Sequence, residues 1–216
     1  GSDELILPMV DVSGSMSCSA GNNPNLTCME VAISLGIYIS ERNEGAFKDM
    51  FMTFSSNPQI QKLLGPLSDR YRQLERAEWG MSTDLKASFK TLLNQAVKFN
   101  IPQNEMPTKV LILSDMEFNH AIGSRYGGNS DWNPSAMAMI DEMFTEAGYV
   151  RPGIIFWNIN ANGGNFPASF DESGTALVSG FSPSIMKSII SNPNSLTPVN
   201  IMKETVDSTR YELVTV

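Results

Sequence analysis

The segment LILPMVDVSGS, residues 5–15, gives the most information about the fold of this chain. Its apolar first half, Leu5–Val10, has the length of a strand and predicts a buried first strand. Its polar second half places Asp11, Ser13 and Ser15 at alternate positions, around a glycine that tolerates a tight backbone before a helix. The stretch therefore predicts one carboxylate and two hydroxyls that leave the end of a buried strand and point inward together.

Strand-length apolar runs alternate with helical patterns along the rest of the chain. We expect further strands at 49–55, 59–64, 109–114, 153–159 and 175–179, helices at 26–43, 83–100, 134–148, 183–190 and 198–207, and an extended end at 211–216. Residues 66–80, 116–133 and 160–169 have the composition of connections and loops. This alternation predicts an α/β fold with a doubly wound, mostly parallel six-stranded sheet in the order 3-2-1-4-5-6 and helices on both faces. Only the third strand, 59–64, is expected to run antiparallel, at the edge.

The amino-acid composition and net charge exclude some classes of function. The 216 residues carry 15 basic and 23 acidic side chains, a formal charge of −8, without a run of Lys or Arg. This argues against a domain that binds nucleic-acid phosphates, and it favours a cation or a protein partner. Because no stretch of 18 apolar residues occurs, we expect no membrane span. We also expect a single domain over residues 3–216, excised from a longer protein, with Gly1-Ser2 as a remnant of cloning.

The chain has two cysteines, Cys18 and Cys28, with nine residues between them. Two free thiols in a reducing, intracellular (cytoplasmic) compartment are the interpretation that we favour. A local disulfide stays open as an alternative. So does half of a zinc site, although only the single histidine, His120, could assist a metal there.

A second carboxylate follows the clearest central strand, because Asp115 comes directly after KVLILS at 109–114. In open α/β sheets, ligands bind beyond the carboxyl ends of the strands, where the strand order reverses. We therefore expect Asp115 to lie beside Asp11, with Thr83 as a third hydroxyl from a neighbouring loop. Ligands that are all oxygen suit a hard cation, with Mg²⁺ the first choice and Mn²⁺ or Ca²⁺ as alternatives.

The predicted metal ligands resemble those of a known family. Asp11, Ser13 and Ser15, with Thr83 before Asp84-Leu85, and Asp115 resemble the metal-ion-dependent adhesion site (MIDAS) of von Willebrand factor A-type (vWA) domains, and the chain order fits over nearly the whole length. Residues 113–118 (LSDMEF), 155–158 (IFWN) and 176–182 (ALVSGFS) look like the vWA domain at the C-terminal end of Ro/TROVE-type proteins. They look still more like a related family of uncharacterised proteins of plants, protists and large viruses.

The resemblance implies a module for protein–protein interaction. Because the residues offer a cation site without a catalytic apparatus, we also expect no catalysis. Its hydroxyls, from Ser13, Ser15 and Thr83, would ligate Mg²⁺ directly, and Asp11 and Asp115 would do so directly or through water. Neutral ligands leave much of the cation's charge uncancelled, so an open position attracts an Asp or Glu of a partner or adjacent domain. Glu117, Asp84 and Glu30 could join the metal shell, although capping or solvent-facing roles compete. The partner surface would be formed by exposed-looking loop residues, namely Arg125, Tyr126, Asp131, Trp132, Asn165 and Phe166.

Two other function classes remain as alternatives. A hydrolase could use Ser13 or Ser15 as a nucleophile with His120 as base, but the chain has no G-x-S-x-G elbow and no phosphate-binding P-loop. A ribonucleoprotein component is suggested by the likeness to Ro-type proteins. There RNA is held mainly by a separate helical ring, and the acidic charge of this chain argues against direct RNA binding by this domain.

Overall fold

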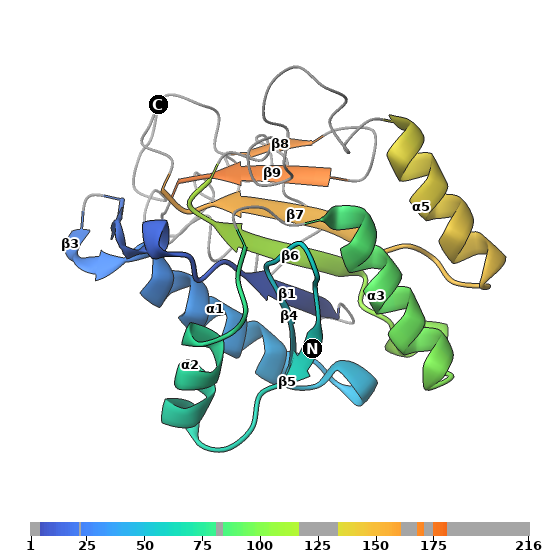
Figure 1. Ribbon diagram of the computed structural model, residues 1–216, viewed down its shortest axis with the longest axis horizontal. Coiled ribbons are helices and arrows are strands. Elements are labelled where there is room, and N and C mark those ends of the chain that lie inside the picture. Colours follow the sequence, from blue (N-terminus) through green and yellow to red (C-terminus); the bar gives the residue numbers. More distant parts are fainter. Residues whose placement is uncertain are drawn as a thin grey trace, which may run out of the picture.

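The computed structural model describes residues 5–21, 23–80, 84–116, 134–160, 168–170 and 175–180. Seven strands form one sheet in the order β5-β4-β1-β6-β7-β9-β8 (Figure 1). In that order they are Ile60–Lys62, Met50–Thr53, Ile6–Val10, Lys109–Ser114, Gly153–Asn158, Thr175–Ser179 and Ala168–Phe170. A separate antiparallel pair, β2 (Ser19–Ala20) and β3 (Asn23–Thr27), follows β1.

The helices pack on both faces of the sheet. They are α1 (Cys28–Arg42), α2 (Leu67–Glu75), α3 (Leu85–Lys98) and α5 (Pro134–Glu146), with 3₁₀ turns η1 (Gly14–Ser17), η2 (Gly45–Phe47) and η3 (Gln103–Glu105). Side chains of α1 and α2 share one buried cluster with one face of the sheet, and those of α3 and α5 share a second cluster with the other face. The layers are therefore helix, sheet, helix.

Neighbouring residues of the central strands enter opposite clusters, which explains why these strands are apolar without alternation. Val10 and Leu111 pack in the α1 cluster, while Met9 and Val110 pack in the α3 cluster. Contact on the α1 side is close, because a Cβ added to Gly36 would lie 2.7 Å from Cγ2 of Val10. That glycine lets the middle of α1 pack directly on the end of β1.

The predicted fold class is confirmed. β1 pairs in parallel with β4 and β6, β6 with β7, and β7 with β9, while β5 runs antiparallel to β4 at one edge. The six expected strands thus lie in the expected order. In Figure 1 the parallel strands β6, β7 and β9 run toward the side on which the β2–β3 pair lies. That side holds the carboxyl ends of the central strands.

Several local expectations were wrong. The sheet has a seventh strand, β8, antiparallel to β9, which overlaps the end of the stretch 160–169 expected to be a loop. Three residues are too few to show a period, so only pairing with β9 defines this strand. Residues 66–80 contain α2 instead of a plain connection, and only Leu74 of that helix is fully buried. The expected helices at 183–190 and 198–207 and the end at 211–216 lie outside the described residues.

Candidate metal centre

Asp11 stands at the carboxyl end of β1 and is completely buried. Its backbone N–H donates to the carbonyl of Leu113 at 2.9 Å, which extends the pairing of β1 with β6. Its carboxylate accepts two hydrogen bonds, from the Ser13 N–H to Oδ1 at 2.9 Å and from the Ser114 hydroxyl to Oδ2 at 2.7 Å. Both oxygens are therefore held in one orientation at the edge of the sheet.

Two opposing effects act on the charge of Asp11. Burial raises the pKa of this carboxyl above its usual value of 3.8, and the hydrogen bonds from Ser13 and Ser114 partly offset that rise. The negative charge of Asp115 adds to the rise in pKa. A cation beside the two carboxylates would relieve both the desolvation and the repulsion, because it favours the ionised forms.

The hydroxyls of Ser13 and Ser15 link this buried carboxylate to Asp115. The two Oγ atoms lie 3.0 Å apart, and the Ser15 hydroxyl donates to Oδ1 of Asp115 at 3.0 Å. Exposure increases along the series, since Ser13 is 8% exposed, Asp115 is half-buried and Ser15 is exposed. The cluster thus opens toward the surface at Ser15.

A 3₁₀ turn after β1 brings the two hydroxyls together. Ser13 precedes η1 with extended backbone angles, and its carbonyl accepts from the Met16 N–H at 3.0 Å. Met16 is completely buried and anchors the turn in the α1 cluster. Gly14 is exposed and has open space at its Cα. We refer below to Gly14–Ser17 with Ser13 as the hydroxyl turn.

The spacing of the oxygens fits a small hard cation. Neighbouring ligands of octahedral Mg²⁺, each about 2.05 Å from the metal, lie about 2.9 Å apart. The two contacts that join Ser13, Ser15 and Asp115 are both 3.0 Å long. In this structure these contacts are hydrogen bonds, and the same spacing could hold Mg²⁺ with little rearrangement.

The centre differs from a carboxylate cage. Within the described ranges, no group of three or more His, Cys, Asp or Glu side chains is placed to hold a metal. Two carboxylates and neutral hydroxyls form the cluster instead. Among the ion pairs of the described residues, none involves Asp11 or Asp115. A cation bound here would keep much of its charge available to a further ligand.

The structure places the other predicted site residues as follows. Asp84 caps α3, because its Oδ1 accepts from the Ala87 N–H at 2.8 Å. Glu30 forms a capping box with Thr27 at the start of α1. Both carboxylates thus serve helix ends. The remaining predicted residues lie outside the described part of the chain: Thr83, Glu117, His120, Arg125, Tyr126, Asp131, Trp132, Asn165 and Phe166.

The sequence did not single out Ser114, which the structure places in the centre. Its hydroxyl holds Oδ2 of Asp11 and accepts from the Met116 N–H at 3.2 Å. The available signal was a hydroxyl at the end of the apolar run KVLILS, beside Asp115. That signal is ambiguous, because a serine at the end of a strand is also a common turn residue.

The fold and this cluster define the class: an α/β module of the vWA/Rossmann-like type with a polar cluster at the carboxyl ends of its central strands. The chain belongs to the family described as Domain of unknown function (DUF7788), whose profile matches residues 6–212. A curated relative is Uncharacterized protein L728 of Acanthamoeba polyphaga mimivirus, 31% identical, with 96% of this chain and 36% of the relative covered.

Two solved structures resemble the chain. The crystal structure of the Deinococcus radiodurans RO (RSR) protein aligns with a TM-score of 0.55 and 19% identity, covering 94% of this chain and 35% of that protein. An aerotolerance-related membrane protein of Bacteroides fragilis aligns over 94% of this chain and 96% of that chain, with 14% identity. Its TM-score is only 0.38. The first likeness supports the fold, and the second is too weak to support it. The chain spans about a third of the mimiviral relative and about a third of the Deinococcus protein.

None of the helices in the described residues is both long and apolar enough to cross a membrane.

Proposed function

We propose that this domain is a Mg²⁺-dependent protein-interaction module that binds an acidic side chain of a partner or of a neighbouring domain. Ser13, Ser15 and Asp115 would hold the cation, with Asp11 ligating directly or through water and Thr83 adding a hydroxyl from its loop. One observation carries the proposal: hydroxyl and carboxylate oxygens gather at 3.0 Å spacing where β1 and β6 end.

The choice of ligands explains why such a centre would bind a partner. Hydroxyls of Ser13 and Ser15 donate electron density without cancelling the charge of the cation. Asp11 is buried and already holds two hydrogen bonds, so it contributes charge from behind the site. A carboxylate that arrives from outside then meets a cation with an open position on the exposed side of the cluster, at Ser15.

The first test measures the cation itself. Calorimetry on the purified domain should show Mg²⁺ binding that Asp115→Asn weakens at least about tenfold, because one of two charges is lost. Glu146→Gln is the matched control, since it removes one charge from an exposed position at the end of α5. Equal Mg²⁺ affinity in wild type and Asp115→Asn would contradict the metal centre.

The second test measures the acidic ligand. A peptide with a single Asp, titrated into the Mg²⁺-saturated domain, should bind, and an otherwise identical peptide with Asn should not. Chelation of Mg²⁺ by EDTA should abolish the difference between the peptides. Binding that persists in EDTA would mean that the cation does not contact the ligand.

We also propose that the domain performs no catalysis of its own. Metal-assisted hydrolysis needs a base beside a metal-bound water, and Glu117 is the one candidate that the sequence offers. His120→Ala should leave Mg²⁺ and peptide binding unchanged. Turnover of a phosphoester or peptide that depends on Glu117 would move the domain into the enzyme class.

A further inference from the structure

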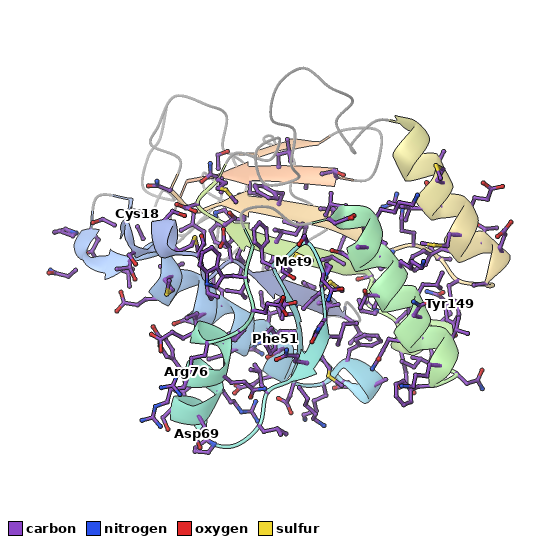
Figure 2. All side chains as sticks on the ribbon, in the orientation of Figure 1. Met9, Cys18, Phe51, Asp69, Arg76 and Tyr149 are labelled. Atoms are coloured by element: carbon purple, nitrogen blue, oxygen red, sulfur yellow. The ribbon has the colours of Figure 1, made fainter. Side chains whose placement is uncertain are left out.

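The two cysteines of the chain lie side by side next to the hydroxyl turn. The Cys18 thiol donates to Sγ of Cys28 at 3.2 Å, and the Cys28 thiol donates to the carbonyl of Ser19 at 3.7 Å. Figure 2 labels Cys18 beside the β2–β3 pair. Both thiols are free in this structure.

The backbone sets this approach. Ser19 pairs with Thr27 in the antiparallel β2–β3 pair, and the Cys28 N–H donates to the Cys18 carbonyl at 2.9 Å, one position further along. Hydrogen-bonded antiparallel pairs have Cα atoms about 5.5 Å apart, inside the range of about 4.4–6.8 Å that disulfides span. The sulfur atoms would need to approach from 3.2 Å to about 2.05 Å, which side-chain rotation and a small shift of the hydroxyl turn would supply together.

We propose that Cys18 and Cys28 form a reversible disulfide that ties the hydroxyl turn to the start of α1. With hydrogen peroxide as oxidant, the Cys18 thiol first loses its proton and the thiolate attacks one peroxide oxygen. The O–O bond breaks, a sulfenic acid forms, and the departing hydroxide takes up that proton and leaves as water. The Cys28 sulfur then attacks Sγ of Cys18, the S–O bond breaks and a second water leaves. In sum, two thiols give two electrons and two protons to one peroxide.

The order of the two steps follows from burial. Cys18 is partly exposed, whereas Cys28 is completely buried in the α1 cluster. Burial also raises the pKa of the Cys28 thiol to about 12. Solvent-borne peroxide therefore meets Cys18 first, and Cys28 serves as the resolving thiol.

The disulfide would act on the candidate metal centre through one short connection. Cys18 directly follows the hydroxyl turn as its C-cap residue, and its N–H donates to the Ser15 carbonyl at 3.1 Å. Metal ligands need to stay within about 0.5 Å of their productive positions, and the sulfurs must close a gap of more than 1 Å. Displacement of the turn should therefore weaken Mg²⁺ binding in the oxidised form. This second step rests on the proposed function.

The first experiment follows the covalent change. Purified, reduced protein is treated with a small excess of hydrogen peroxide at low protein concentration. We expect an intact-mass loss of about 2 Da, disappearance of both alkylatable thiols after unfolding, and full recovery with dithiothreitol. Because the chain has 2 cysteines, an intramolecular disulfide can only join this pair. Two unreacted thiols, oxidation of Cys18 to the sulfinic acid alone, or a disulfide between two chains would each overturn the proposal.

Single substitutions provide the control. Cys18→Ala and Cys28→Ala each leave one thiol, and the peroxide should then add oxygen without any loss of mass. Alanine is chosen because a serine at position 28 would bury a hydroxyl in an apolar cluster. The wild-type result stands by itself if either variant fails to fold.

The second experiment compares Mg²⁺ affinity in the two redox forms. Calorimetry should show at least threefold weaker binding to the oxidised protein, on the order of the effect of a small ligand displacement. Equal affinity would overturn the regulatory step and leave the disulfide intact. Absence of Mg²⁺ binding in both forms would contradict the proposed function, and the mass measurement would still decide the disulfide.

Discussion

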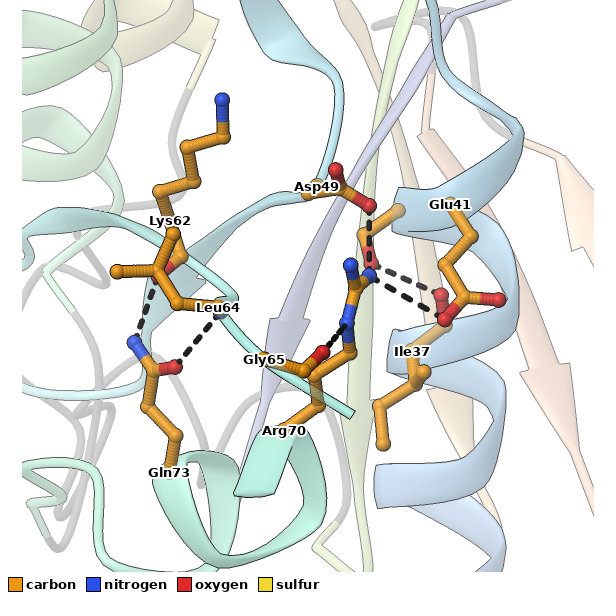
Figure 3. A network of polar contacts seen from close by, with 9 residues as sticks. Ile37, Glu41, Asp49, Lys62, Leu64, Gly65, Arg70 and Gln73 are labelled. Atoms are coloured by element: carbon orange, nitrogen blue, oxygen red, sulfur yellow. Dashed lines mark hydrogen bonds and ion pairs between the residues drawn. The ribbon is translucent and has the colours of Figure 1, made fainter. Parts of the chain in front are cut away.

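Two pairs of carboxylates in this domain have opposite electrostatic settings. Glu41 and Asp49 share a cation of the protein, because Nη1 of Arg70 lies 3.2 Å from Oε1 of Glu41 and 2.7 Å from Oδ1 of Asp49 (Figure 3). Asp11 and Asp115 have hydroxyls and a backbone N–H around them, and no ion pair within the described residues. We call Glu41 and Asp49 the compensated pair, because they share the positive charge of Arg70, and Asp11 and Asp115 the uncompensated pair, because none of the described ion pairs includes them.

The two pairs also lie at opposite ends of the parallel strands. Asp49 immediately precedes β4, and Arg70 binds it from α2 while its Nε donates to the Gly65 carbonyl at 2.9 Å. Asp11 and Asp115 immediately follow β1 and β6. In open α/β sheets the amino ends of strands serve the fold and the carboxyl ends serve binding. The pair with an internal cation lies at the amino ends of the strands, and the pair without one lies at their carboxyl ends.

The largest expected effect tests the uncompensated pair. Asp11→Asn should reduce Mg²⁺ affinity at least about 100-fold, because a charge is removed from behind the cation. In EDTA the same variant should unfold within a few degrees of wild type, since the neutral amide removes the cost of a buried charge. Thermal unfolding with and without Mg²⁺ measures both quantities. If Mg²⁺ stabilises Asp11→Asn as much as it stabilises the wild type, the uncompensated pair does not bind the cation.

The second prediction tests the compensated pair, Glu41 and Asp49. Arg70→Met should lower the free energy of unfolding by about 2 kcal/mol, because it leaves the carboxylate of Asp49 mostly buried without its partner. Urea unfolding measures this loss. The matched control is Arg72→Met, whose ion pair with Asp69 is exposed at both ends and should contribute less than about 0.5 kcal/mol.

Calorimetry on Arg70→Met should also give wild-type Mg²⁺ affinity. A parallel loss of Mg²⁺ binding would mean that the two ends of the sheet are coupled, which the separation by whole strands argues against.

The third prediction concerns the neutral ligands. Ser15→Ala should weaken Mg²⁺ binding about threefold, less than the loss of a charge, because water can replace a hydroxyl ligand. Ser17→Ala in the same 3₁₀ turn is the matched control, since its side chain is exposed and forms no described hydrogen bond. If both variants bind alike, the hydroxyl of Ser15 is not a ligand.

The sequence could predict that Asp11 and Asp115 lie together at one edge of the sheet. The end of a strand can be recognised from the residues around it, without knowledge of distant contacts. Apolar runs at 5–10 and 109–114 each stop at an aspartate, and parallel pairing of two such strands places their ends at one edge. The same reasoning predicted the order of the six main strands. Long-range contacts were not needed for either inference.

What the sequence could not predict depends on long-range partners. The Arg70 cluster joins α1, α2 and the start of β4, and α2 itself is a polar helix that only packing defines. Likewise, Ser114 orients Asp11 across 103 positions of sequence, and β8 exists only through its pairing with β9. Such contacts need the assembled sheet, so composition and period do not reveal them.

The smallest expected effect is a pH dependence of stability that arises at Asp11. Burial raises the pKa of Asp11 in the folded protein above its usual value of 3.8. In EDTA, the stability contributed by this group is therefore full below about pH 4 and is lost as pH rises through the raised pKa. Relative to Asp11→Asn, the wild type should lose stability over that interval. With excess Mg²⁺ the slope should reverse, because the cation binds the ionised carboxylate and protons compete with it. Unfolding curves of both proteins from pH 4 to 7, with EDTA and with Mg²⁺, decide the matter. Parallel curves in EDTA would show that the hydrogen bonds from Ser13 and Ser114 fully offset the burial of this charge.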